Sequence, residues 1–324
     1  MSIQFGDISL TILLGFLLSF FFTNKAIPIL QKKQMGQNIR EEGPESHLKK
    51  AGTPSMGGVA IILAVVIAVL VGAVGRNTLG DALVCISGFV VFGAIGFFDD
   101  YLKVIKKQNE GLKAHQKFGL QLVFAILFAI YMVKLSGLGT EVYIPFFKIY
   151  IDFGIWYVPF VIFVILAMTN GVNLTDGLDG LAAGVTMIVS LYMCYVAADI
   201  GIISSEIFFA ALAGGCLGFL LLNKNPAKIF MGDTGSLAIG GGITVAAFLM
   251  KMEFLLPIAG IIYVLETLSV VLQVGYFKIT KGKRLFRMAP LHHHFEEGGM
   301  KETKVVAMFW CITIICSVIA VFIA

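Results

Sequence analysis

Charged residues are scarce in this sequence, and their scarcity argues against a soluble globular protein. Only 14% of the 324 residues are charged, whereas 58% are hydrophobic. Soluble domains usually contain about 25% charged residues. The composition therefore indicates a polytopic membrane protein in which residues 1–324 form one integral membrane domain.

Cysteines are also few, and their placement excludes two kinds of site. All five fall in or beside apolar runs, with no CxxC pair and no metal-binding spacing. We therefore expect small buried apolar side chains rather than a disulfide framework or a cysteine-bound metal. A cleaved leader is not expected either, because Asp7 and no basic residue precede the first apolar run and no small-residue cleavage site is evident.

Long apolar runs, in contrast, are abundant. A helix needs about 20 residues to cross about 30 Å of hydrocarbon. Ten runs meet this length, at about 8–30, 54–74, 79–98, 118–135, 155–170, 181–199, 205–222, 235–250, 256–278 and 304–323. We expect an all-α protein with ten transmembrane helices, and a small β-hairpin around Pro145 near 141–151.

The basic residues predict which loops face the cytoplasm, because cytoplasmic loops are enriched in Lys and Arg. Alternate loops must lie on the same side of the membrane. One alternate set carries 17 of the 24 Lys and Arg residues: 31–53, 99–117, 171–180, 223–235 and 279–303. We expect these five loops to form a cytoplasmic active site, with both termini and the hairpin on the outer side.

The start of the second run has helix-entry features. Thr53 before Pro54 is typical of an N-cap followed by proline at the first helical position. Gly57 and Gly58 would let another helix approach closely. The preceding Lys49 and Lys50 fit either membrane anchoring or the binding of an anionic group.

Two adjacent carboxylates, Asp99 and Asp100, end the third predicted helix. The dipole disfavours negative charge at a helix C-terminus, so we do not expect capping to explain them. Their pairing favours a bound cation, and oxygen ligands near phosphates favour magnesium. The alternative is a solvated pair bridged to Lys103 or Lys106.

The stretch 173–180 places polar side chains and two glycines between two apolar runs. Asp176 or Asp179 alone is explained as a cap of the next helix. Asn173 and Thr175 crowd beside them, however, and one cap needs one side chain. The cluster therefore favours contact with a sugar, a base edge or a metal-bound phosphate.

Asp233 lies where the eighth predicted helix begins, in Gly232-Asp233-Thr234-Gly235-Ser236. A helix N-terminus attracts phosphate, and Asp233 would bring magnesium to it; an ordinary N-cap is the alternative. Phe230 either stacks on a base or dips into lipid.

The ninth run carries Glu266 and Gln273 within apolar sequence. Polar groups there are costly, which predicts an internal partner. His292, His293 and His294 follow a basic run and would project in different directions on a helix, so three ligands to one metal are not expected. Imidazoles beside a phosphate are the simpler interpretation.

These motifs occur in a characteristic order: DDxxK at 99–103, NLTDGLDG at 173–180, NxxP…FMGDTGS at 223–236 and PLHHHFE at 290–296. The chain thereby resembles the polyprenyl-phosphate N-acetylhexosamine-1-phosphate transferase superfamily over its whole length. PLHHHFE together with KKxGTPSMGG at 49–58 favours the muramoyl branch. Ser55 stands where many relatives have threonine, which keeps the hydroxyl.

The resemblance implies a magnesium-dependent transferase of bacterial peptidoglycan synthesis. It would transfer phospho-MurNAc-pentapeptide from UDP-MurNAc-pentapeptide to undecaprenyl phosphate, giving lipid I and UMP. It would lie in the bacterial inner (cytoplasmic) membrane, with its active site on the cytoplasmic face. The partners implied are the two substrates, the lipid bilayer and a second copy in a homodimer, without nucleic acid.

The resemblance also implies residue roles. Asp233 and Asp176 would bind magnesium, and Asp99 and Asp100 would lie beside the lipid phosphate. The remaining implied contacts are with the substrates: the nucleoside-binding turn Asp176, Gly177, Leu178 and Asp179, with Asn173, Lys50, Asn223 and Phe230; the phosphate-neutralising Lys103 and Lys117; His292 and His293 at the phosphate and sugar; and Gln273 near the lipid groove.

Three alternatives stay open at this point. Ten apolar helices with a basic inner face also fit a transporter or lipid flippase, although transporters place polar sites near the bilayer midplane. A related enzyme would use UDP-GlcNAc as donor. A covalent phospho-carboxylate intermediate would replace direct attack by the lipid phosphate.

Overall fold

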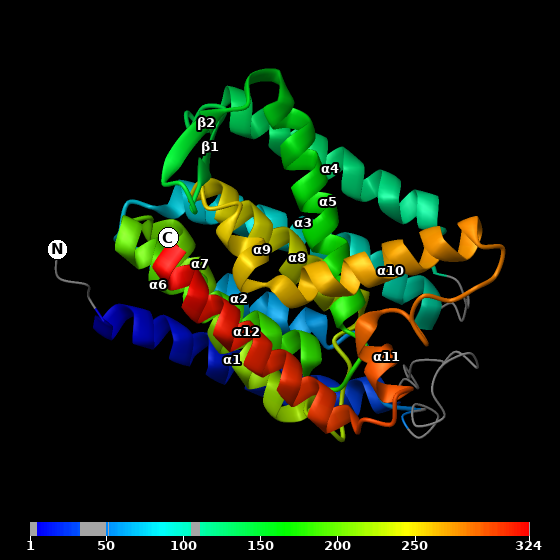
Figure 1. Cartoon of the computed structure of the whole chain (residues 1–324). Helices are drawn as coiled ribbons and strands as arrows, with labels where there is room; N and C mark the ends of the chain where they lie inside the picture. Colours follow the sequence, from blue (N-terminus) through cyan, green and yellow to red (C-terminus); the bar gives the residue numbers. More distant parts are fainter. Residues whose placement is uncertain (1–4, 33–49, 51, 105–110, 324) are drawn as a thin grey trace.

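The computed structural model describes residues 5–32, 50, 52–104 and 111–323, and these form a helical bundle with one small sheet (Figure 1). The predicted features at Lys49 and Lys106 lie outside the described residues. The α-helices are α1 (Phe5–Lys32), α2 (Gly58–Ala73), α3 (Leu79–Val104), α4 (Ala114–Lys134), α5 (Tyr157–Thr175), α6 (Leu181–Ile200), α7 (Ile203–Asn223), α8 (Gly232–Leu249), α9 (Leu255–Ala259), α10 (Ile261–Ile279), α11 (Leu291–Glu296) and α12 (Glu302–Ile323).

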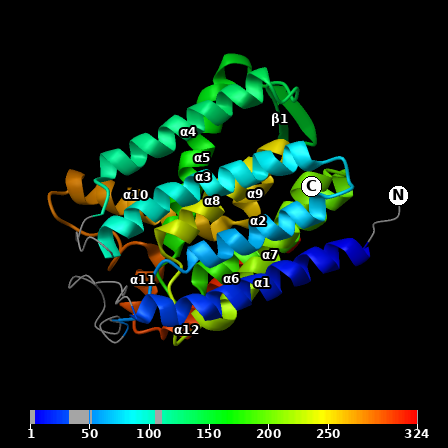
Figure 2. The same ribbon diagram turned by 180° about the vertical axis from the view of Figure 1, so that it is seen from behind.

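Eight helices of the described chain are long and apolar enough to cross a membrane, which makes this a polytopic membrane protein. They correspond to eight of the ten predicted runs. The other two runs form α2, with 16 residues, and α8, with 18 residues. Ten spans therefore stay a prediction. The start of α1 and the end of α12 lie at the same end of the bundle in both views (Figures 1 and 2).

Helix α8 lies in the middle of the bundle, and every residue from Thr234 to Leu249 is buried (Figures 1 and 2). Glycines allow its neighbours to approach closely. A Cβ atom on Gly58 would lie 2.1 Å from the backbone nitrogen of Gly235, and one on Gly96 would lie 2.0 Å from the carbonyl oxygen of Asp233. The close approach predicted for Gly58 is thus confirmed, and Gly96 does the same for α3.

The helix start predicted at Pro54 is wrong. Helix α2 begins at Gly58, because the preceding residues pair with the segment that leads into α8. The N–H of Phe230 donates to the carbonyl of Pro54, and the N–H of Gly57 donates to the carbonyl of Phe230. These backbone bonds hold residues 54–57 against the segment that leads into α8, so α2 starts only at Gly58.

A two-stranded antiparallel sheet follows α4. Strand β1 (Glu141–Ile144) pairs with β2 (Ile149–Asp152), with Tyr143 opposite Tyr150, and the 3-10 helix η2 (Gly154–Trp156) leads into α5. The Lys251 ammonium group donates to the carbonyls of Gly139 and Glu141, which attaches the hairpin to the turn after α8. Its outer-side location stays a prediction.

Helix α10 is separated from α9 by Gly260, and its second half extends beyond the neighbouring helices (Figure 1). It exposes large apolar side chains, including Leu268, Val271, Leu272 and Phe277. In a bilayer, these exposed apolar side chains of α10 face lipid.

All five cysteines are free, as expected, but Cys311 is exposed rather than buried.

We predict that Gly96→Ala destabilises the protein, because its methyl group would push α3 away from the backbone of α8. Overpacking of this kind costs about 1–3 kcal/mol. Gly80→Ala is the matched control, since it lies on the same helix and a Cβ there meets nothing within 4 Å. Thermal unfolding of the purified protein checks this, and equal apparent Tm values for the two variants would contradict the close packing.

Candidate active site

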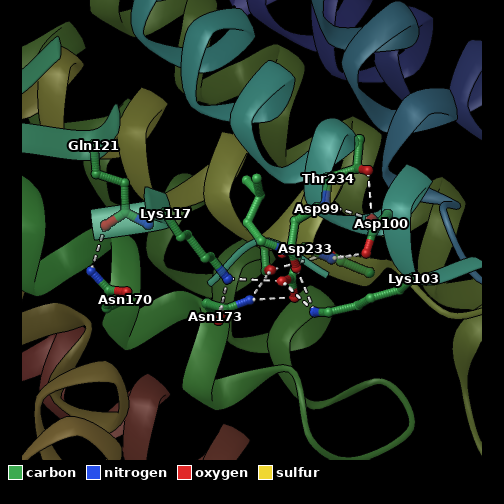
Figure 3. Close-up of polar contacts among 12 residues, drawn as sticks. Asp99, Asp100, Lys103, Lys117, Gln121, Asn170, Asn173, Asp233 and Thr234 are labelled. Carbon is green, nitrogen blue, oxygen red and sulfur yellow. Dashed lines mark hydrogen bonds and ion pairs between the residues drawn. The ribbon is translucent and has the colours of Figure 1, made fainter. Parts of the chain in front are cut away.

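The C-terminal turns of α3 meet the N-terminus of α8, and this contact brings three carboxylates together (Figure 3). Ligand atoms of Asp99, Asp100 and Asp233 all lie within 4.8 Å of one another. Asp99 and Asp100 are buried and Asp233 is half-buried. The sequence proposed all three as site residues, and the structure places them in one cluster.

Asp100 caps α8 from a different helix. Its carboxylate accepts hydrogen bonds from the backbone N–H of Asp233 (3.2 Å) and of Thr234 (2.9 Å), and from the Thr234 hydroxyl (2.6 Å). These are N–H groups that a helix N-terminus leaves without helical partners, and the dipole favours an anion there. The expectation that capping does not explain this pair is therefore wrong for Asp100, which caps another helix, and Asp100 is buried rather than solvated.

Asp233 does not cap its own helix, since the N-cap residue is Met231 and makes no side-chain cap bond among the described residues. Instead, the Asp233 carboxylate accepts from the ammonium groups of Lys117 (2.8 Å) and Lys103 (3.0 Å). Asn173 donates its amide to the other oxygen at 2.9 Å. The N-cap alternative for Asp233 is thus wrong, and the side chain lies among cations.

Electrostatics keep Asp233 ionised. Burial alone would raise the pKa of Asp233, but its hydrogen bond with Asp99 and the nearby charge of Lys117 lower that pKa well below its ordinary value. The opposite holds at Asp176, which is half-buried after the end of α5. There, burial and the negative charges of Asp233 and Asp100 raise the pKa well above its ordinary value.

The chemistry of the cluster suits a divalent metal. Three carboxylates offer the hard oxygen ligands that magnesium and calcium prefer. Among the described residues, the cluster that fits a metal consists of Asp99, Asp100 and Asp233 and does not include Asp176. A metal role for Asp176 therefore stays a prediction, while Asp99 and Asp100 lie in the cluster that could hold a metal.

A second polar cluster lies beside the first, around Asp179. The Lys50 ammonium group bridges Asp179 at 2.7 Å and Glu302 at 2.6 Å. The second Asp179 oxygen accepts from the Asn225 amide at 3.1 Å and from the N–H of Ala227 at 3.0 Å. Asp179 thus joins the 173–180 turn to the 223–230 loop rather than capping α6.

Asn223 has a similar structural role. Its side-chain oxygen accepts from the N–H of Gly180 at 3.0 Å, and its amide donates to the carbonyl of Ile229 at 2.9 Å. Leu178 is buried beneath the same turn, and the side chain of Phe230 is half-buried at the loop's end. Asp179 and Phe230 therefore lie in two connected loops, and the polar groups of Asp179 and Asn223 are engaged within the protein.

The three histidines have three different partners, which agrees with the prediction that their side chains project in different directions. His292 contacts Glu266 through Nδ1 at 3.0 Å, and both side chains are buried. His293 contacts Glu296 at 3.0 Å, and His294 accepts from the N–H of Arg287 at 3.1 Å. The internal partner expected for Glu266 is therefore His292.

Gln273 also has a partner within the protein. Its side-chain oxygen accepts from the N–H groups of Leu285 (3.1 Å) and Phe286 (2.8 Å). This oxygen holds the loop after α10 against the helix. Contact of Gln273 with the lipid tail stays a prediction.

Sequence reasoning missed several polar residues that complete the site. Gln121 accepts a hydrogen bond from Asn170 at 2.8 Å, about one helical turn away from Lys117 and Asn173 (Figure 3). Glu302, Asn225 and Thr234 were also not assigned roles. Glu302 begins a helix, where an acid is favoured by the dipole alone, so its local sequence carries no sign of a distant partner.

Comparison with known proteins agrees with these motifs. A family model described as glycosyl transferase family 4 matches residues 82–251, and residues 50–62 match phospho-N-acetylmuramoyl-pentapeptide-transferase signature 1. A phospho-N-acetylmuramoyl-pentapeptide-transferase of Clostridium perfringens is 49% identical, with 97% of each chain covered. Proteins of the same name from Heliobacterium modesticaldum and Clostridioides difficile are 49% and 45% identical, covering 92% and 99% of this chain and 92% and 100% of their own.

The similarity extends over nearly the whole chain rather than over one part of it. The chain belongs to the phospho-N-acetylmuramoyl-pentapeptide-transferase family.

Proposed function

We propose that this protein transfers phospho-MurNAc-pentapeptide from UDP-MurNAc-pentapeptide to undecaprenyl phosphate, producing lipid I and UMP. The observation that carries this proposal is the meeting of three carboxylates and two lysines where α3 and α8 come together. The donor is water-soluble and the acceptor is held in the bilayer. A transferase joining them needs its charged groups at one membrane surface, and here they gather at one end of the bundle.

We propose magnesium as the divalent metal, held by Asp99, Asp100 and Asp233. A bound divalent cation supplies positive charge against the phosphates of both substrates. Lys103 and Lys117 surround the same cluster, and their ammonium groups are positioned to neutralise phosphate oxygens. Phosphoryl transfer depends mainly on such positioning and charge stabilisation.

The reaction is direct attack in this proposal. An oxygen of the lipid phosphate forms a bond to the sugar-linked phosphorus, and the bond from that phosphorus to the bridging oxygen breaks. UMP leaves with that bond's electron pair. The second pKa of a phosphate monoester is about 6, so much of the lipid phosphate is already dianionic at neutral pH. Asp99 therefore serves mainly to position groups rather than to remove a proton.

The 176–180 turn is the proposed nucleotide-binding element. Three side chains hold this turn in place. Asp179 contacts Lys50 and the N–H of Ala227, and Asn223 accepts from the N–H of Gly180. Phe230 stacks on uracil, and Asn173, which already contacts Asp233, orients the phosphates. His293 completes the site on the sugar side, and the buried His292 packs against Gly177 of the turn.

We place this site on the cytoplasmic face of the bacterial inner membrane, and we expect a homodimer without nucleic acid. The basic loops support that orientation. The exposed apolar side chains of α10 border the proposed groove for the polyprenyl tail. A transporter is less well supported, since the deep carboxylate of Glu266 is engaged by His292 rather than free for a substrate.

The direct test is UMP release by the purified full-length protein in vesicles. UDP-MurNAc-pentapeptide and UDP-GlcNAc are supplied separately, each with and without undecaprenyl phosphate. We expect UMP only with the first donor and only with the lipid. The proposal would be overturned if UMP were released with UDP-GlcNAc and not with UDP-MurNAc-pentapeptide. It would also be overturned if the protein moved lipid between leaflets without releasing UMP. Exchange of labelled UMP into the donor without lipid would instead favour the covalent route.

Asp233→Asn should lower the rate of UMP release by at least about 100-fold, the scale for loss of an electrostatic group aimed at the transition state. The magnesium concentration needed for half-maximal activity should rise. Asp199→Asn is the matched control, because Asp199 is exposed at the end of α6, outside the cluster. An Asp233→Asn variant with the wild-type rate and magnesium requirement would rule out this ligand role.

Phe230→Ala should raise the apparent KM for the nucleotide donor about 5-fold or more, since stacking on a base contributes about 1–3 kcal/mol. The KM for the lipid should change less. Phe230→Tyr keeps an aromatic face and should behave like the wild type. Steady-state kinetics with each substrate varied in turn measure this, and an unchanged donor KM in the alanine variant would show that Phe230 does not stack.

A further inference from the structure

Glu266 and His292 form a buried pair that is joined by two hydrogen-bonding contacts. The carboxylate accepts from the backbone N–H of His292 through Oε1 (3.2 Å) and lies 3.0 Å from Nδ1 through Oε2. Glu266 is 0% exposed and His292 is 1% exposed. When Glu266 is ionised, its carboxylate only accepts hydrogen bonds, and the Nδ1 position of His292 then carries the proton.

The opposite edge of the same imidazole faces the 176–180 turn. A Cβ atom placed on Gly177 would lie 2.2 Å from His292 Nε2, so the ring packs directly against the glycine backbone. Nε2 is buried and has no hydrogen-bond partner among the described residues. The imidazole therefore forms the floor of the turn, and Gly177 is the residue that permits this contact.

The protonation of Nε2 matters because the turn covers it. A buried N–H without an acceptor, and still more a buried imidazolium, is costly. With the proton held at Nδ1 by Glu266, Nε2 presents only a lone pair to Gly177. The pair thus fixes both the orientation of the ring and the absence of a hydrogen atom beneath the turn.

We propose that Glu266 is a positioning residue of the transferase, which acts through the His292 tautomer to hold the 176–180 turn in its nucleotide-binding conformation. This inference rests on the proposed function for its kinetic consequence. Glu266 lies in α10, the helix with the lipid-exposed apolar side chains, so the pair also links that helix to the donor side of the site.

Glu266→Gln tests the proposal because it preserves the shape and removes the obligatory acceptor. The backbone N–H of His292 can only donate a hydrogen bond, so the side-chain oxygen of the glutamine must stay on its side as the acceptor. The glutamine NH2 group then faces Nδ1, which must become an acceptor, and the proton moves to Nε2 beneath Gly177. Loss of the hydrogen-bond partner of a metal-binding histidine costs about 10-fold to 100-fold, and we expect kcat/KM for the nucleotide donor to fall on a similar scale here.

Ser269→Ala is the matched control. Ser269 is buried one turn along the same helix, and its hydroxyl donates to the backbone carbonyl of Glu266 without touching the carboxylate. Its removal should leave donor kinetics unchanged. A similar loss in both variants would mean that any disturbance of α10 has this effect, and would overturn the specific role of the carboxylate.

The tautomer is measured independently of activity by 15N NMR of histidine-labelled full-length protein, with the His292 signals assigned by their loss in His292→Asn. We expect a protonated Nδ1 and an unprotonated Nε2 in the wild type, and the reverse in Glu266→Gln. A wild-type spectrum with Nε2 protonated would overturn the proposal. Absence of UMP release by the wild type would refute the proposed function while leaving this spectroscopic result decisive.

Discussion

The hydrogen bonds from the α8 N-terminus to Asp100 are the contact on which the site depends. A buried carboxylate is stable there because it receives two backbone N–H groups and a hydroxyl at the positive end of a helix. The contact requires the close approach of α3 and α8 that Gly96 permits. Asp99, the preceding residue, and Asp233, the acid of α8, are thereby brought together, and Lys103 bridges the two.

Around this contact, each acid is balanced by groups from other helices. Lys117 from α4 and Asn173 from α5 reach Asp233, and Lys50 lies between Asp179 and Glu302. Buried charges are tolerated only when they are paired and hydrogen-bonded. The arrangement therefore ties several helices together at one end of the bundle while presenting lysine ammonium groups and carboxylates to phosphate-bearing substrates.

Much of this could be predicted from the sequence, because apolar runs mark helices and clustered polar residues mark their functional ends. The limits have physical causes. Two of the ten predicted runs, α2 and α8, are not among the eight candidate spans. Helix α8 is surrounded by protein, so it contains glycines and hydroxyl residues in place of lipid-facing apolar side chains. The order of the motifs identified Asp99, Asp100 and Asp233 as site residues. Local sequence does not show, however, that Asp100 of α3 caps α8, the helix that contains Asp233.

Contacts between distant segments could not be predicted from the sequence either. Glu302 is joined to Lys50 across nearly the whole chain, and the reason for Gly177 appears only when His292 is seen against it. Glu266 was recognised as needing a partner because of its apolar surroundings, yet three neighbouring histidines were equally available in sequence. Selection among them depends on the turn at Pro290, which begins α11 and directs His292 inward.

The central claim is that acids from α3 and α8 form one divalent-metal site. Electron paramagnetic resonance of the purified full-length protein titrated with Mn²⁺ tests it most directly, with Asp100→Asn compared with the wild type. We expect saturable Mn²⁺ binding in the wild type and its loss or marked weakening in the variant. Equal Mn²⁺ binding by the two proteins would contradict the account.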